Sequence, residues 1–175
     1  MGPDRGDDVA NDMTGRQPIR VFVLDDHEVV RLGMSDLLEA EPDIHVVGDT
    51  GTAASAVAEI MALRPDVAIL DVRLSGHSGV DVCREIHKRL PGVACLMLTA
   101  YDDDRALRDA ILAGCAGYML KQIRGTSLAT AVRTVAAGHS VLDPYATSRL
   151  MAWMRDRYRR ASVSVPIPGA SRPGP

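Results

Sequence analysis

Five short apolar runs alternate with longer segments whose apolar residues recur at helical spacing, and this alternation leaves few possible folds. The apolar runs occupy residues 19–24, 44–48, 67–71, 93–98 and 117–120. The segments with helical spacing occupy about residues 27–41, 52–63, 80–90, 102–113 and 125–137. Strands that alternate with helices in this way form parallel sheets with right-handed crossovers, covered by helices on both faces. We therefore predict an α/β protein, a flavodoxin-like (βα)5 three-layer sandwich with a parallel five-stranded sheet.

The length of 175 residues leaves room for one ordinary domain with extensions at both ends. We expect a disordered leader at 1–17, a domain at 18–140, a linker or dimerisation helix at 141–160 and a disordered tail at 161–175. The leader lacks the apolar core of a signal peptide, and no run approaches the roughly 18 apolar residues of a membrane helix. The sequence thus predicts a cytoplasmic protein that makes no membrane contact.

The net charge excludes no partner, because local basic patches remain possible, whereas the cysteine pattern argues against two kinds of site. The formal net charge of -3 gives no overall attraction to nucleic acid or to an anionic membrane. Cys83, Cys95 and Cys115 are odd in number, far apart and set in apolar segments. This pattern favours reduced, buried thiols over a disulfide framework or a CxxC metal site.

The segment from Pro144 to Arg160 has the pattern of one further amphipathic helix. Its apolar positions are Leu150, Trp153, Met154 and Tyr158, and its polar side carries Arg149, Arg155, Arg157, Arg159 and Arg160. The simpler interpretation is a docked or dimerising helix with a solvated basic face. A contact with nucleic acid is the alternative, which the sequence leaves open.

Polar side chains follow four of the predicted strands at the point where each strand ends. They are Asp25 and Asp26, Asp71, Thr99, and Lys121. In an open α/β sheet the carboxyl ends of the strands border the crevice in which ligands bind. Each residue alone has an ordinary explanation, such as an Asp that caps the next helix. Their recurrence at strand ends predicts one site that contains all five.

Three carboxylates within a few ångströms repel one another unless a cation neutralises them, and Mg²⁺ favours oxygen ligands of this kind. We predict Asp26 and Asp71 as direct ligands, Asp25 acting through water, and the backbone carbonyl of Arg73 at a further position. A carboxylate can accept a phosphoryl group where a metal ion and an ammonium neutralise the phosphoryl oxygens. Asp71 is then the acceptor, and Lys121 supplies the ammonium.

Four motifs resemble the receiver domain of bacterial response regulators over about residues 19–139. They are VLDDHEVVR at 23–31, PDVAILD at 65–71, LTAY at 98–101 and GYMLK at 117–121. Within that family the sequence is similar to the NarL/FixJ subfamily, and most of all to regulators of the DevR/DosR type. The resemblance implies a sensor histidine kinase as phosphodonor and a phosphoaspartate at Asp71. It also implies Mg²⁺ held by Asp25 and Asp26, with Thr99 and Lys121 engaging the phosphoryl group.

The resemblance further implies that Tyr118 is the rotating aromatic of the family, although on pattern alone it is an ordinary half-buried sheet aromatic. Two features depart from the family. Gln122 stands where many receivers have proline, and the sequence after Arg160 could not form the helix-turn-helix effector of NarL/FixJ regulators. The chain is then either a receiver fragment or a natural regulator without a DNA-binding domain.

Three hypotheses follow. The first is a phospho-accepting receiver, not an enzyme, that signals through protein contacts and dimerises under the control of phosphorylation; such a chain does not bind DNA by itself. The second is the regulatory part of a DNA-binding transcriptional regulator whose effector is absent from this chain or replaced by the basic helix. The third is an aspartyl phosphatase. Such hydrolases favour a second acid two residues after the nucleophile. Arg73 occupies that position in this sequence, which argues against a phosphatase.

Overall fold

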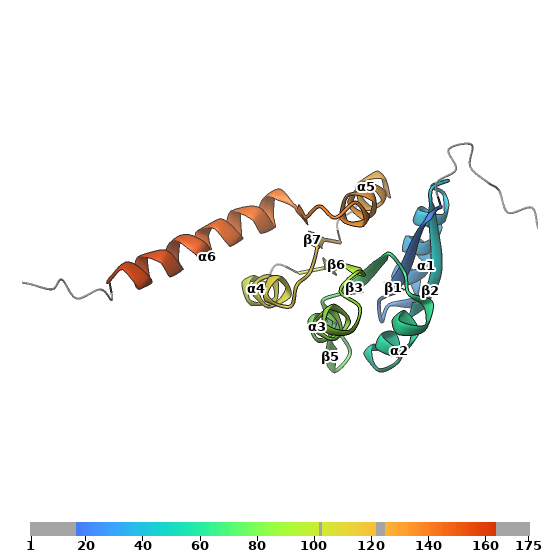
Figure 1. The fold of residues 1–175 in the computed structure, drawn as a ribbon, viewed down its shortest axis with the longest axis horizontal. Helices are drawn as coiled ribbons and strands as arrows, with labels where there is room; N and C mark the ends of the chain where they lie inside the picture. The colour runs from blue at the N-terminus through green and yellow to red at the C-terminus, as the bar shows by residue number, and fades with distance from the viewer. Residues whose placement is uncertain (1–16, 102, 122–124, 164–175) are drawn as a thin grey trace, which may run out of the picture.

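The computed structural model describes residues 17–101, 103–121 and 125–163, which fold as a parallel sheet with helices on both faces (Figure 1). This confirms the predicted flavodoxin-like α/β architecture. Nearly all of the predicted leader at 1–17, and the predicted tail from residue 164 onward, lie outside the described residues.

The main sheet has six strands, one more than predicted. The strands are β1 (Ile19–Leu24), β2 (Ile44–Thr50), β3 (Val67–Asp71), β6 (Ala94–Thr99), β7 (Gly117–Leu120) and β8 (Val141–Leu142). Their order is β2-β1-β3-β6-β7-β8, and every pair in it is parallel. The sixth strand has only two residues, and it pairs with the edge of β7 at a point where the sequence suggested the start of a linker.

The helices follow the predicted segments closely. They are α1 (Glu28–Glu39), α2 (Ala53–Leu63), α3 (Gly79–Arg89), α4 (Asp104–Leu112), α5 (Gly125–Ala136) and α6 (Pro144–Val163). The loop after β3 contains an unpredicted short antiparallel pair, β4 (Arg73–Leu74) with β5 (His77–Ser78). This hairpin lies beside the carboxyl end of β3.

Alternating residues of the central strands supply two separate hydrophobic cores. In β1, Phe22 and Leu24 belong to a core with residues of α2, α3 and α4, whereas Val21 and Val23 belong to a core with residues of α1 and α5. The same alternation holds in β3, where all five residues are buried. A strand buried on both faces is what an uninterrupted apolar run predicts.

The turn from the hairpin into α3 is fixed by two local features. The Ser78 hydroxyl accepts a hydrogen bond from the N–H of Val80 and so caps the helix. A Cβ at Gly79 would lie 1.9 Å from the backbone oxygen of Asp71, so this position accepts no side chain. The start of α3 can therefore lie directly against the end of β3.

Helix α6 leaves the body of the molecule and extends away from the sheet (Figure 1). Its first turn is anchored. The carboxylate of Asp143 accepts hydrogen bonds from the N–H groups of Ala146 and Leu120, and Arg149 forms an ion pair with Asp104 of α4. Ala146 is buried at this contact. The rest of the helix makes few contacts with the body.

The described residues bear on the predictions made for the cysteines and for membrane-spanning helices. The three thiols are free, with Cys83 and Cys95 buried and Cys115 partly buried, as predicted. Among these residues, no helix combines the length and hydropathy that crossing a bilayer requires.

Candidate functional site

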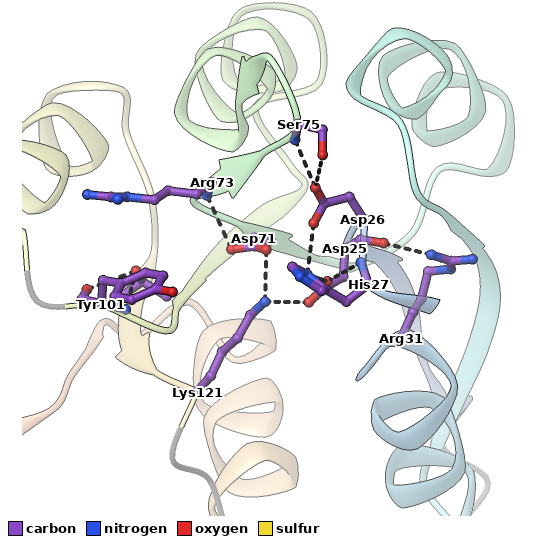
Figure 2. A network of polar contacts seen from close by, with 10 residues as sticks. Asp25, Asp26, His27, Arg31, Asp71, Arg73, Ser75, Tyr101 and Lys121 are labelled. Carbon is purple, nitrogen blue, oxygen red and sulfur yellow. Dashed lines mark hydrogen bonds and ion pairs between the residues drawn. The ribbon is translucent and has the colours of Figure 1, made fainter. Parts of the chain in front are cut away.

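The site lies at the carboxyl edge of the sheet, between β1 and β3. The chain passes from β1 to β2 on one side and then returns to β3 on the other, so the two connections diverge at the edge where open α/β sheets bind ligands. Asp25 follows β1, Asp71 ends β3, Thr99 ends β6 and Lys121 follows β7. Figure 2 shows Asp25, Asp26, Asp71 and Lys121 gathered at this edge.

Lys121 joins two of the acids directly. Its Nζ donates hydrogen bonds to Asp25 Oδ2 at 2.6 Å and to Asp71 Oδ2 at 2.8 Å. Burial opposes the charged form of the ammonium, but the bonds to Asp25 and Asp71 outweigh it and raise the pKa of Lys121. Its backbone N–H bonds to the Thr99 carbonyl at 2.7 Å, which continues the pairing of β7 with β6. The ammonium is thus held as a cation between the two carboxylates.

Asp71 is almost fully buried, and its carboxylate has few donors for its charge. Burial raises the pKa of Asp71 above the usual value, although the hydrogen bond from Lys121 and the backbone N–H of Arg73 lower it. The N–H of Arg73 donates to Asp71 Oδ1 at 3.2 Å. The side chain is therefore positioned from both sides while its negative charge remains only partly compensated.

Asp26 is oriented by the loop that follows β3. Its Oδ2 accepts hydrogen bonds from the backbone N–H of Ser75 at 2.8 Å and from the Ser75 hydroxyl at 2.7 Å (Figure 2). The hydroxyl bond is the main reason that the pKa of Asp26 is lowered. The second oxygen, Oδ1, is buried, lies 3.0 Å from Nδ1 of His27 and accepts no hydrogen bond from the described residues.

The acids are close enough to share a metal ion. One ligand atom from each of Asp25, Asp26, His27 and Asp71 can be chosen so that all four lie within 4.8 Å of one another. Three carboxylates at this separation repel one another, and Lys121 neutralises only one unit of charge. Oxygen donors in this number suit a hard divalent cation such as Mg²⁺. The Oδ1 atom of Asp26 is a buried acceptor in position for such an ion.

Thr99 lies at the same edge but is turned toward the next loop. Its hydroxyl donates to the carbonyl of Tyr101 at 2.9 Å and accepts from the N–H of Tyr101 at 3.2 Å. The side chain is buried. Among the described residues, the Thr99 side chain forms no hydrogen bond with the acids or with Lys121.

The side chain of Arg73 also points to this loop. Its guanidinium lies over the ring of Tyr101, 5.2 Å from the centroid, and donates to Asp103 Oδ2 at 3.0 Å. Asp103 in turn caps α4 by accepting from the N–H groups of Arg105 and Ala106. Arg73 thus connects the residue beside Asp71 to the start of α4. The proposed ligand role of its backbone carbonyl stays a prediction.

Tyr118 lies away from the acids, in β7, and is 4% exposed. Together with Leu107 of α4 and with Tyr145 and Ala146 of α6, it lines a small cavity next to the anchored first turn of α6. Tyr118, the predicted switch residue, therefore lies on β7 next to the start of the C-terminal helix. Gln122 lies outside the described residues.

The sequence did not predict that Ser75 orients Asp26 or that Asp143 anchors the start of α6. Ser75 is 49 residues from Asp26, and its only signal was its position in a loop of glycines and serines after a strand that ends in an acid. Asp143 precedes a proline at a helix start, which is a recognisable capping pattern. Its bond to Leu120 depends on the position of β8.

A comparison with models of protein families identifies the family of this protein. The model of the response regulator receiver domain matches residues 21–133. The chain therefore belongs to the response regulator receiver family and contains the receiver domain of a two-component response regulator. This is a signalling domain whose family acts in phosphorelays, and the matched relatives include DNA-binding regulators.

Two individual response regulators show how similar the chain is to members of this family. The chain is 52% identical over 137 residues to the DNA-binding transcriptional activator DevR/DosR of Mycobacterium tuberculosis, an alignment that covers 78% of this chain and 63% of that protein. It is 35% identical to the response regulator protein VraR of Staphylococcus aureus, covering 81% of this chain and 66% of VraR. The chain thus spans about two thirds of the length of these relatives. The predicted resemblance is confirmed.

Solved structures agree with the fold. The signal receiver domain of the putative response regulator NarL from Mycobacterium tuberculosis is similar with a TM-score of 0.68 and 32% identity, over 71% of this chain and 100% of that one. A two-component response regulator of the LuxR family from Aurantimonas sp. SI85-9A1 gives a TM-score of 0.73 at 25% identity, over 81% and 99% of the two chains.

Proposed function

We propose that Asp71 accepts a phosphoryl group from a sensor histidine kinase and that the modified domain signals through protein contacts. The observation that carries the proposal is the position of the Asp71 carboxylate, at the end of β3 and 2.8 Å from the Lys121 ammonium, among two further acids. In the transfer, a carboxylate oxygen of Asp71 forms a bond to phosphorus. The phosphorus–nitrogen bond of the phosphohistidine breaks, and the imidazole leaves with the electron pair.

Lys121 has two successive tasks in this proposal. Before transfer its positive charge partly offsets the negative charges of the two buried carboxylates, Asp25 and Asp71. During transfer it donates to an oxygen of the incoming phosphoryl group, where negative charge accumulates. The raised pKa of Lys121 supports both tasks because the ammonium stays protonated.

Mg²⁺ is the proposed cofactor, held directly by Asp26 and Asp71, through water by Asp25, and by the backbone carbonyl of Arg73. The ion would supply positive charge beside the phosphoryl oxygens. Ser75 keeps Asp26 ionised and oriented by two hydrogen bonds to its Oδ2, which leaves Oδ1 for the ion.

Thr99 and Tyr118 are the proposed switch residues. The Thr99 hydroxyl donates to the Tyr101 carbonyl, and it can donate to a phosphoryl oxygen only by leaving that carbonyl. The loop before α4 would lose one fixed contact, and Tyr118 lies beneath the adjacent face of α4. We expect the output to be homodimerisation in the cytoplasm, without DNA binding by this chain alone.

The direct test is incubation with acetyl phosphate and Mg²⁺, followed by intact mass measurement. The wild-type chain should gain one phosphoryl group, and Asp71→Asn should gain none. Asp36→Asn, an exposed acid of α1, is the matched control and should be modified like the wild type. An adduct that persists in Asp71→Asn, or its absence from the wild type, contradicts the proposal.

Metal binding is tested by thermal unfolding with increasing MgCl₂. An ion that binds only the folded state stabilises it by about 1.4 kcal/mol at ten times its Kd. We expect this rise for the wild type and its loss in Asp26→Asn, with Asp36→Asn behaving as wild type. Equal responses of wild type and Asp26→Asn would remove Asp26 from the proposed ligand set.

A second candidate function is that of the regulatory part of a DNA-binding transcriptional regulator. It is supported by the 52% identity to the activator DevR/DosR. The two candidates differ in what this chain does alone, and fluorescence anisotropy with duplex DNA measures it. Binding that weakens with added salt and with Arg155→Ala would assign DNA contact to α6 and overturn the first candidate's output.

A further inference from the structure

The imidazole of His27 lies beside the acid cluster and does not serve the start of its own helix. His27 is the N-cap residue of α1, a position where a side chain often accepts a hydrogen bond from the first turn, but its ring accepts none. Its close neighbours are two carboxylates instead. Nδ1 lies 3.0 Å from Oδ1 of Asp26 and 3.5 Å from Oδ1 of Asp25 (Figure 2).

The short distance between Nδ1 of His27 and Oδ1 of Asp26 is not that of a hydrogen bond. Oδ1 is buried and accepts no hydrogen bond from the described residues, although the nitrogen is only 3.0 Å away. Two ligands of one octahedral ion have the same relation. Bound at about 2.1 Å and at a right angle, they lie about 3.0 Å apart without bonding to each other.

The second oxygen of each of these two acids is already held by a donor. Oδ2 of Asp26 accepts two hydrogen bonds from Ser75, and Oδ2 of Asp25 accepts one from Lys121. The oxygens that lie near the imidazole of His27 are the Oδ1 atoms of both acids. The contacts to Oδ2 thus fix the two carboxylates with Oδ1 next to the ring.

The backbone that carries the imidazole is also fixed. The N–H of His27 donates to Oδ1 of Asp25 at 2.9 Å, and its carbonyl accepts from the N–H of Arg31 at 3.0 Å. The Arg31 guanidinium donates to the carbonyl of Asp25 at 2.7 Å and to Oδ1 of Asp49 in β2 at 2.6 Å. The His27 side chain itself is 71% exposed, so the ring can adjust to an ion while the turn stays in place.

We propose that Nδ1 of His27 is a ligand of the metal ion at this site, next to Oδ1 of Asp26, in place of one water molecule. The inference rests on the metal site of the proposed function and names the class of ion that it favours, a divalent transition-metal ion. Imidazole nitrogen suits ions such as Ni²⁺ and Fe²⁺, whereas Mg²⁺ favours oxygen ligands and keeps several waters. Mg²⁺ therefore gains little from His27.

Isothermal titration calorimetry of the untagged chain, with NiCl₂ and with MgCl₂, tests the ligand. Oxygen ligands alone can also prefer Ni²⁺, so the readout is the change in the ratio of the two dissociation constants. Losing a group that merely supports a ligand costs 10- to 100-fold in affinity, so His27→Ala should reduce the preference for Ni²⁺ by at least about tenfold. An equal ratio in the wild type and in His27→Ala overturns the proposal.

His139→Gln is the matched control. His139 is exposed after α5 and is not among the four residues whose ligand atoms lie within 4.8 Å of one another. Its replacement should leave the ratio of the dissociation constants as in the wild type. A reduction as large as that in His27→Ala would assign the preference for Ni²⁺ to exposed histidines in general and overturn the proposal.

His27→Asn separates loss of the ligand from damage to α1. Asparagine is a favoured N-cap residue, so the start of the helix should be retained, while the imidazole nitrogen is removed. The preference for Ni²⁺ should fall as it does in His27→Ala. A wild-type preference in His27→Asn would make the helix start, and not the imidazole, responsible, and it would overturn the proposal.

Proton NMR of the chain loaded with paramagnetic Ni²⁺ reports the bond directly. A coordinated imidazole gives ring resonances shifted far outside the range of the metal-free chain. These resonances should be present in the wild type and in His139→Gln, and absent from His27→Asn. Their persistence in His27→Asn would remove His27 from the ligands.

Failure of this inference can be told apart from failure of the proposed function. Asp26→Asn should weaken both ions because it removes a ligand that they share. That result, with an unchanged ratio in His27→Ala, rejects His27 as a ligand and keeps the proposed Mg²⁺ site. A wild type that binds neither ion rejects the proposed cofactor and the ligand role of His27 together. Metal binding without a phosphoryl adduct on Asp71 rejects only the phosphoryl transfer.

Discussion

The acid cluster at the sheet edge and the exposed apolar side chains of α6, Met151, Met154 and Tyr158, depart from ordinary burial in opposite directions. At the sheet edge charged groups are buried, with Asp25 fully inaccessible and Asp71 5% exposed. On α6 apolar groups are in water, with Tyr158 77% exposed. Buried charge costs free energy unless it is paired, and exposed apolar surface forgoes the stabilisation that burial provides. Both regions therefore point to a ligand or partner that completes them.

The two regions differ in how strongly the stability of the folded domain depends on them. The acids are tied into the fold by Lys121 and by Ser75, so removing one member leaves others buried and unpaired. The apolar side chains of Met151, Met154 and Tyr158 on α6 are instead largely exposed. The comparison predicts large changes in stability from the first region and small ones from the second.

The largest effect is expected from Lys121→Ala. It leaves Asp25 and Asp71 buried without their shared cation, and breaking such a pair costs about 3 kcal/mol or more. Urea denaturation at neutral pH measures the loss. Lys88→Ala, an exposed lysine of α3, should change stability by less than about 0.5 kcal/mol. Equal effects of the two substitutions would mean that the acid cluster does not depend on Lys121.

An intermediate effect of opposite sign is expected from Asp71→Asn. Burial raises the pKa of Asp71, so the folded state binds a proton more readily than the unfolded state does. The contribution of Asp71 to stability therefore falls as the pH rises from 3.8 through the raised pKa. The amide should therefore raise the free energy of unfolding at pH 7 relative to the wild type.

This gain should shrink as the pH is lowered through 3.8, because below that value Asp71 carries a proton in both the folded and the unfolded wild-type chain. Urea denaturation of wild type and Asp71→Asn across this range gives the difference at each pH. A gain that grows on acidification would contradict the assignment of burial as the dominant influence on Asp71.

The smallest effect is expected from the exposed apolar side chains of α6. Met154→Ala should change the unfolding free energy of the dilute chain by less than about 0.5 kcal/mol, as for other exposed sites. Met97 is fully buried in β6, and Met97→Ala should cost about 2 to 5 kcal/mol. Similar losses at the two methionines would show that α6 is part of the folded core.

The sequence was sufficient to predict the elements whose signals are local. Apolar runs such as Val67–Asp71 become strands that are buried on both faces, and the position of an acid at a strand end is enough to place it at the carboxyl edge. Asp25, Asp26, Asp71 and Lys121 meet there as expected.

Features that depend on pairing between distant segments were not predictable in this way. Two residues, Val141 and Leu142, carry no strand pattern of their own and become β8 only because the edge of β7 lies beside them. Thr99 is at the predicted edge, but its hydroxyl is directed to Tyr101, a choice that depends on the loop conformation. Ser75 reaches Asp26 only through the β4–β5 hairpin, which the sequence suggested merely as a loop.

The length of α6 gives its anchor a mechanical consequence. Twenty residues of helix extend about 30 Å, and the contact with α4 holds only the first turns. A rotation of about 10° at this fulcrum would move the far end by roughly 5 Å, several times the displacement at Arg149 itself. A small rotation of the first turns, beside Tyr118, would therefore produce a displacement at the far end about as large as one helix turn.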